Sequence, residues 1–324
     1  MRARTAGMRL VFVTNNASRT PESVAVQLTG LGIEARAADV MNSAQAAAAR
    51  LATELSVGDR VLVVGGAGLV EEVRAAGFEV VTSADDHPKA VVQGFAPDVG
   101  WSQLAEAAFA VQRGAWHVVS NRDLTLPTER GDAPGNGSLV AVVQTATGIE
   151  PLSVGKPEPT MFRLAAQRCG GQRPLVVGDR LDTDLAAARA AGFPGLQVLT
   201  GVSSARDAVL AVPAERPSFL GRDLRSLHVA HSAPHPGPEG WWRCGGAAAR
   251  VVDGRLELHP AGGGGVDGDG AGGGVAGDRS GGGGVDGDGV DGDGLDLARA
   301  ACAAVWSAAD AGTVVDPGSV PDLA

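Results

Sequence analysis

Short apolar runs alternate along the chain with longer segments in which apolar residues recur at helical spacing. Strand-like runs lie at 61–65, 78–81, 90–95, 117–121 and 174–179. Helical patterns lie at 43–55, 69–76, 101–113, 158–169 and 182–191. Alternation of this kind predicts an α/β architecture with parallel sheets that helices cover.

The first such unit is RLVFVTNNASRTPESVAVQLTGLGI, residues 9–33. Its strand ends at Thr14, and a polar loop leads to Pro21, which suits the first position of a helix with Thr20 as the N-cap. The periodicity predicts an apolar helix face made of Val24, Leu28 and Leu31.

The polar strand ends lie in two segments, 9–20 and 154–184, that are far apart in sequence. We therefore predict one core domain from 1–42 and 151–230, interrupted by an inserted domain at 43–150. Beyond it we expect a hairpin-like accessory segment at 231–260, a Gly/Asp-rich flexible linker at 261–294, and a helix with a tail at 295–324. The linker is too poor in apolar residues to offset its backbone entropy.

The composition of the chain excludes several classes of function. The formal charge of −10 argues against a nucleic-acid partner, and no apolar run is long enough for a membrane span or a signal peptide, so we expect a cytoplasmic protein that binds small ligands. The three cysteines are widely spaced and show no metal or disulfide pattern. Of 27 basic residues only Lys89 and Lys156 are lysines, so each lysine stands out.

Polar residues follow two of the predicted strands, where ligands of parallel sheets bind. Thr14-Asn15-Asn16 offers a hydroxyl and backbone N–H groups suited to a phosphoryl oxygen. Asp179, in GDRLDTD, directly follows a strand and is suited to Mg²⁺, although one carboxylate is few for a metal site. Lys156, in VGKPEP, supplies a compact positive charge. Taken singly, these motifs also fit an Asx turn, acidic residues at a helix N-terminus and a surface lysine.

The ordered set VTNN, GKPEP and GDRLDTD resembles the haloacid dehalogenase superfamily, in particular its class IIA, the p-nitrophenylphosphatase and phosphoglycolate-phosphatase-like enzymes. The resemblance covers about residues 7–230, and SNRDLTLP…NGSLV (120–140) is similar to the cap segment of that class. It implies a Rossmann-like core, an α/β cap at 43–150, and Mg²⁺-dependent hydrolysis of a small phosphate ester.

The resemblance also implies residue roles. Asp179 would bind Mg²⁺, and Asp184 would orient Lys156 or a metal-bound water. Thr14, Lys156 and Asp184 would be catalytic. The substrate-binding set would be Thr14, Asn15, Asn16, Asn121, Asp123 and Lys156, with Asn15 acting through its backbone.

The family's first motif, DxDGT, has no counterpart, because only MRARTAGMRLVFV precedes Thr14. In the family its first Asp attacks phosphorus to form an aspartyl-phosphate, and its second acts as general acid and base. Residues 2–6 are typical of a helix end and Gly7 of its cap. We therefore expect a misassigned start or a fragmentary gene, and a 324-residue form that is poorly stable and inactive. The alternative is a catalytically silent homologue that binds phosphate or a partner.

Three further sequence patterns suggest other binding sites, but each of them is weaker evidence than the three motifs above. VLVVGGAGLVEEV (61–73) resembles a dinucleotide-binding turn, but Glu71 stands where the third glycine belongs. The VDGDG repeats resemble calcium-binding tracts without their strict period. His228, His231 and His235 could form a metal-binding cluster, but they lie in a Pro-rich connection that is typical of solvated histidines. The substrate and the oligomeric state stay open.

Overall fold

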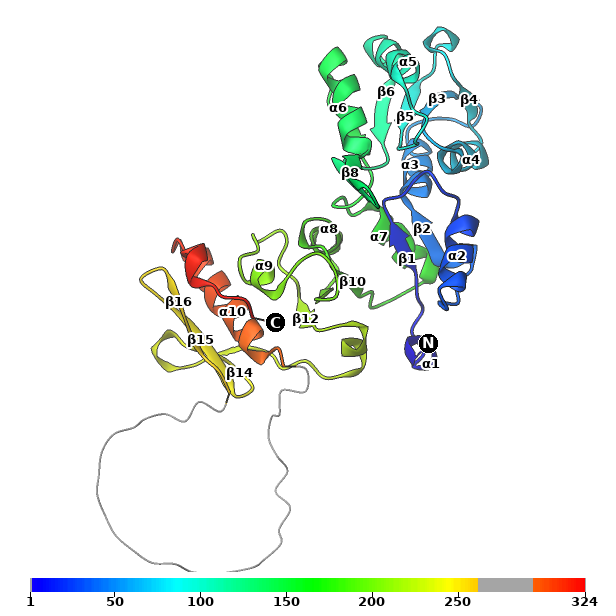
Figure 1. Cartoon of the computed structure of the whole chain (residues 1–324). Coiled ribbons are helices and arrows are strands. Elements are labelled where there is room, and N and C mark those ends of the chain that lie inside the picture. The colour runs from blue at the N-terminus through cyan, green and yellow to red at the C-terminus, as the bar shows by residue number, and fades with distance from the viewer. Residues whose placement is uncertain (1, 262–293, 324) are drawn as a thin grey trace, which may run out of the picture. The chain divides into compact units, whose positions relative to one another are not determined.

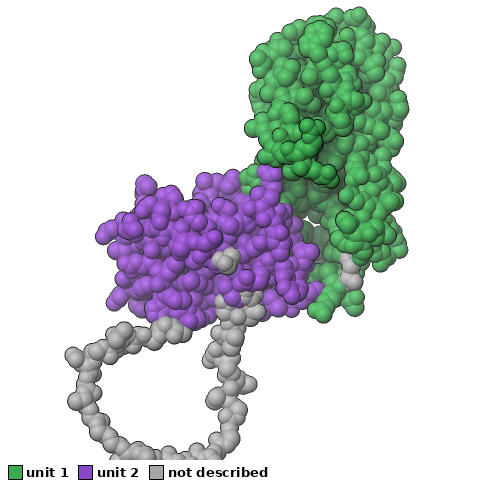
Figure 2. All heavy atoms as spheres, viewed as in Figure 1, with its two compact units in different colours: residues 1–176, 182–195 green, residues 177–181, 196–324 purple. Residues whose placement is uncertain are grey.

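The computed structural model describes residues 2–261 and 294–323. The Gly/Asp-rich linker and its VDGDG repeats, expected at 261–294, lie almost wholly outside the described residues. The chain divides into two compact units, which Figure 2 colours separately: residues 1–176 with 182–195, and residues 177–181 with 196–324. No described helix is long and apolar enough to cross a membrane.

The first unit contains a five-stranded parallel sheet in the order β4-β3-β5-β6-β9 (Figure 1). Its strands are β3 (Arg60–Val64), β4 (Glu79–Val81), β5 (Ala90–Gln93), β6 (Trp116–Val119) and β9 (Leu152–Ser153). The helices of this region are α3 (Ser43–Leu51), α4 (Ala67–Ala75), α5 (Trp101–Gln112), α6 (Asn136–Thr147) and α7 (Thr160–Cys169). A short antiparallel hairpin joins β7 (Thr125–Thr128) to β8 (Gly131–Pro134).

The chain enters this unit through α1 (Arg2–Thr5), β1 (Phe12–Thr14), α2 (Pro21–Gly30) and β2 (Val40–Asn42). Strand β1 pairs in parallel with β2. Helix α2 begins as predicted, with Pro21 in its first turn and the Thr20 hydroxyl accepting from the Ser23 N–H at 3.2 Å.

The predicted apolar face of α2 is wrong in part. Ala25 is buried on this helix, whereas Leu31 is 70% exposed and Val26 is 73% exposed. Val24 and Leu28 of the predicted face are half-buried beside Ala25, and Leu31 lies directly after the end of the helix.

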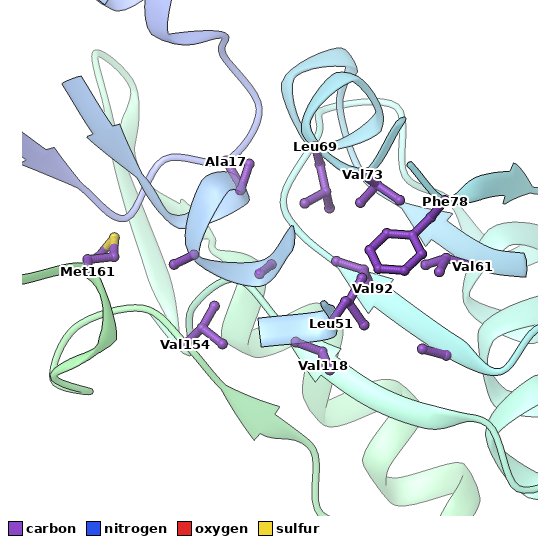
Figure 3. Packing of buried hydrophobic residues seen from close by; sticks show 14 of the residues in the cluster. Ala17, Leu51, Val61, Leu69, Val73, Phe78, Val92, Val118, Val154 and Met161 are labelled. Atoms are coloured by element: carbon purple, nitrogen blue, oxygen red, sulfur yellow. The ribbon is translucent and has the colours of Figure 1, made fainter. Parts of the chain in front are cut away.

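One apolar core runs through this unit (Figure 3). It joins residues of the predicted insertion, such as Val61, Val92 and Val118, to residues of the predicted core domain, such as Ala17 and Met161. Strands β3, β5 and β6 contribute to this core from one face of the sheet, and their residues on the other face, such as Leu62 and Val91, belong to a second buried cluster.

The second unit holds β11 (Gly195–Val198, from Leu196) paired in parallel with β12 (Phe219–Gly221), and α9 (Ala205–Val209). Its other sheet is antiparallel, with β13 (His235–Pro236), β14 (Trp242–Cys244), β15 (Ala247–Val252) and β16 (Arg255–His259). Helix α10 (Asp296–Asp310) packs on this sheet and on α9 through Ala301, Val305 and their neighbours. Strand β10 (Val176–Gly178) pairs next to β11.

The α/β class with parallel sheets is confirmed, as is the C-terminal helix. The compact units do not follow the predicted domain boundaries, since residues 196–230 pack with the C-terminal sheet and α10 rather than with β1. The division into core, cap and accessory segments therefore stays a prediction.

Candidate functional site

The polar loop after β1 is built on side-chain to backbone hydrogen bonds. The Thr14 hydroxyl oxygen accepts from the Asn16 N–H at 3.1 Å, and the Asn16 carboxamide oxygen accepts from the N–H and the hydroxyl of Ser18. This is the Asx turn that the sequence left open. Since Thr14 uses only an acceptor position here, its O–H can still donate to an anionic oxygen.

Asn15 is where four segments meet. Its carboxamide contacts the backbone of Lys156 and the carboxylate of Asp123, and its carbonyl oxygen accepts from the Ser43 hydroxyl and the Asn121 amide. Asn121 is buried, and its own carbonyl accepts from Asn136 at 2.7 Å. The family resemblance placed Asn15, Asn121, Asp123 and Lys156 in one substrate-binding set, and the structure brings these four residues together through hydrogen bonds.

Lys156 and Asp184 form a close ion pair. The Lys156 Nζ lies 2.6 Å from Asp184 Oδ1, and the two side chains are 14% and 12% exposed. Asp184 lies on a single π-helical turn (Leu181–Leu185) that precedes α8 (Ala186–Ala191). Such turns are rare in proteins overall, and those that occur are often found at functional sites. The pair is largely withdrawn from solvent, so its attraction is screened less than that of a surface pair.

Glycines allow the segments of this site to approach one another. A methyl group on Gly155 would overlap the Ser120 carbonyl oxygen and lie 2.9 Å from the Asn15 Oδ1 atom. Only a residue without a side chain therefore fits between the Asn15 loop and the end of β6.

The glycines that resembled a dinucleotide-binding turn have a different role. A methyl group on Gly68 would lie 2.7 Å from the Arg19 backbone, and the Gly68 N–H donates to the Ser18 carbonyl at 3.2 Å. The chain's own loop thus occupies the position next to the first turn of α4 where a phosphate would bind.

Asp179 belongs to the second unit. Its Oδ2 accepts from the Val202 N–H at 2.9 Å, and the Ser203 N–H donates to its carbonyl. A methyl group on Gly201 would overlap this carboxylate. Within residues 2–261 and 294–323, Asp179 Oδ1 accepts no hydrogen bond, which leaves an oxygen of the kind that Mg²⁺ prefers. The same described residues contain no cluster of three or more His, Cys, Asp or Glu side chains suited to a metal.

A second buried polar pair lies inside the five-stranded sheet. His117 is 2% exposed and its Nε2 lies 3.1 Å from the Oε1 of the fully buried Gln93. Burial, with a smaller contribution from the nearby Arg122 charge, lowers the pKa of His117 to about 4. His117 is therefore a neutral core residue at physiological pH.

Sequence reasoning missed Ser43, Asn136, Gly155 and Gly201. Ser43 could have been found by the rule that selected Thr14, because it also follows a strand end, in VMNS. The glycines carry no sequence signal, since the chain contains 48 of them.

Comparison with known proteins identifies the family to which this chain belongs. A family model described as haloacid dehalogenase-like hydrolase matches residues 1–79, and a related one described as HAD-hydrolase-like matches residues 153–227. The chain is 51% identical over 245 residues to a D-glycerol 3-phosphate phosphatase of Mycobacterium tuberculosis, covering 75% of this chain and 69% of that protein. The chain belongs to the haloacid dehalogenase-like hydrolases.

Two further relatives extend the comparison of this hydrolase. An acid sugar phosphatase of Staphylococcus aureus is 37% identical over 203 residues, which are 62% of this chain and 77% of that one. The crystal structure of glycerol phosphate phosphatase from M. tuberculosis in complex with magnesium aligns with a TM-score of 0.76 at 44% identity, covering 92% of this chain and 81% of that chain. The family predicted from the three motifs is confirmed, and with it a hydrolase by family.

Proposed function

We propose that this chain carries the phosphate and Mg²⁺ groups of a phosphatase that hydrolyses a small phosphomonoester, such as a glycerol phosphate, through an aspartyl-phosphate, and that the attacking carboxylate is absent from the sequence as printed. The observation that carries the proposal is the Lys156–Asp184 ion pair. The Lys156 ammonium is shielded from solvent, and the Lys156 backbone is bound by Asn15, the residue after Thr14. The substrate class is taken from the 51%-identical glycerol 3-phosphate phosphatase. The cytoplasmic location expected from the sequence stays a prediction.

The roles follow from the chemistry of each group. The Thr14 O–H donates to a phosphoryl oxygen, and the Lys156 ammonium offsets the negative charge that builds up as the phosphoryl group transfers. Asp184 holds the ammonium in place. Asn16 and Asn121 stabilise the loop after β1 through the contacts described above. We propose that both also lie next to the substrate.

The chemistry of Asp179 fits a magnesium ligand, because its carboxylate offers a hard oxygen that accepts no hydrogen bond among the described residues. Asp179 would hold the ion. When bound, Mg²⁺ supplies Lewis-acid stabilisation of the phosphoryl oxygens.

The attacking carboxylate is the part of the proposal that rests on family resemblance alone. The resemblance places it before Thr14, and residues 1–13 contain neither Asp nor Glu. The test must therefore compare the chain as printed with a form extended to the nearest upstream in-frame start of its gene.

The experiment measures phosphate release from glycerol 3-phosphate and from p-nitrophenyl phosphate with Mg²⁺, for both forms. We expect turnover in the extended form that Asp179→Asn abolishes. Lys156→Arg should lower kcat/KM about a hundredfold, since loss of one stabilising contact to the transition state has this size. Lys89→Arg, at the other lysine, is the matched control and should leave kcat/KM unchanged.

Absence of turnover in both forms would refute the proposal. If the same preparations still bound inorganic phosphate by calorimetry, the catalytically silent homologue would be the better interpretation.

A further inference from the structure

The side chain of Asn15 binds both backbone polar groups of Lys156. Its Oδ1 accepts from the Lys156 N–H at 2.8 Å, and its Nδ2 donates to the Lys156 carbonyl at 3.1 Å. One carboxamide thus pairs with one residue as a neighbouring strand would. Hydrogen bonds to both the N–H and the carbonyl of one residue fix the orientation of its backbone as well as its position.

The second N–H of the Asn15 carboxamide points at Asp123. The Nδ2 atom lies 3.2 Å and 3.4 Å from the two carboxylate oxygens of Asp123. Because an ionised carboxylate only accepts hydrogen bonds, it selects the orientation of the carboxamide in which nitrogen faces Asp123 and oxygen faces the Lys156 N–H. Asp123 is held in turn by its own N–H, which donates to Asn121 Oδ1 at 3.1 Å.

The backbone of Asn15 is held from the other side. Its carbonyl oxygen accepts from the Ser43 hydroxyl at 2.6 Å and from the Asn121 amide at 2.8 Å. Both N–H groups of the Asn15 side chain are therefore used within the protein, and the side chain keeps none to donate to a phosphate.

We propose that Asn15 and Asp123 are positioning residues that hold the Lys156 backbone so that its ammonium meets Asp184, and that their side chains do not contact the substrate. This assignment rests on the proposed function only in the role it gives Lys156. It differs from the family-based expectation, which placed Asp123 among the residues that bind the substrate.

The scarcity of lysine makes a direct test possible. In the 324-residue chain labelled with ¹⁵N-lysine, the backbone amides of Lys89 and Lys156 are the two lysine signals, and Lys89→Arg assigns them. Hydrogen exchange at each amide is measured without phosphate. The Lys89 N–H donates to the Arg60 carbonyl at 2.9 Å and serves as the internal control.

We expect Asn15→Ala to speed exchange of the Lys156 amide at least about tenfold, because the amide loses its acceptor. The Lys89 amide should stay unchanged. Asp123→Ala should act in the same direction, whereas Asp123→Asn, which can still accept from Asn15, should stay close to the parent protein.

An unchanged Lys156 exchange rate in Asn15→Ala would overturn the proposal. If Asn15→Ala unfolds the unit, both amides exchange faster together, and the Asp123 pair decides: equal Lys156 rates in Asp123→Ala and Asp123→Asn would also overturn it. Since no turnover enters this measurement, its failure is distinct from a failure of the phosphatase assay.

Discussion

Replacing His117 by glutamine should change how the stability of the protein depends on pH. The pKa of His117 is about 4 in the folded protein, against about 6.5 for an exposed histidine. Between these two values the unfolded chain binds a proton at this position that the folded protein does not. The free energy of unfolding therefore falls as pH is lowered through this range, and the loss levels off below about pH 4.

The size of the effect follows from the shift. Linkage gives a loss of about 2 kcal/mol between pH 7.5 and pH 5, and about 3 kcal/mol once both states are protonated. The carboxamide in His117→Gln cannot titrate, and it can still donate to Gln93 in place of the imidazole N–H. Over the same interval the free energy of unfolding of this variant should thus change by about 2 kcal/mol less than that of the parent.

The assay is urea unfolding of both proteins at pH 7.5, 6 and 5, with attention to the cooperative transition of the unit that contains His117. The matched control is His87→Asn, which removes an exposed histidine at a positive φ that Asn tolerates. Equal pH dependence in the parent and in His117→Gln would refute the argument that burial keeps this imidazole neutral.

Two further predictions concern packing. Gly155→Ala should lower the free energy of unfolding by about 2 kcal/mol, since its methyl group would overlap the Ser120 carbonyl oxygen. Gly100→Ala, whose methyl group would have open space, should change the free energy of unfolding far less. Comparable losses for the two variants in urea unfolding would contradict this. Burial raises the pKa of Cys302 to about 12, so at pH 8 a thiol reagent should titrate only the half-buried Cys169 quickly and all three thiols after unfolding. Fast reaction of two or more thiols in the native protein would count against this burial.

The parts of the fold that the sequence predicts are those in which a side chain's size matches its burial. Val61 and Val92 lie in continuous β-branched runs, and their strands form where expected. Alanine carries no such signal in this Ala-rich chain. Ala46 lies within α3 and is fully buried, whereas Ala52 lies directly after α3 and is exposed. The predicted face of α2 misses Ala25 for the same reason.

The candidate site was predictable as a set of strand-end residues, because the ends of parallel strands collect polar side chains. The Lys156–Asp184 pair is an example. The contacts of the Asn15 side chain were not predictable, since they depend on how loops from three distant segments pack. A carboxamide in an Asn-Asn pair looks the same in sequence whether it caps a turn or binds another segment.

The late position of α10 in the chain has a consequence for synthesis on the ribosome. Ala301 and Val305 of this helix complete the core that begins with Ala205 and Ala208. Every residue of the first unit has left the ribosome once Gly195 has emerged. The second unit must instead wait for α10, and until then the apolar face of the antiparallel sheet that this helix covers stays exposed. A ribosome that stalls before α10 would thus release a nascent chain with exposed apolar surface, which chaperones and proteases recognise.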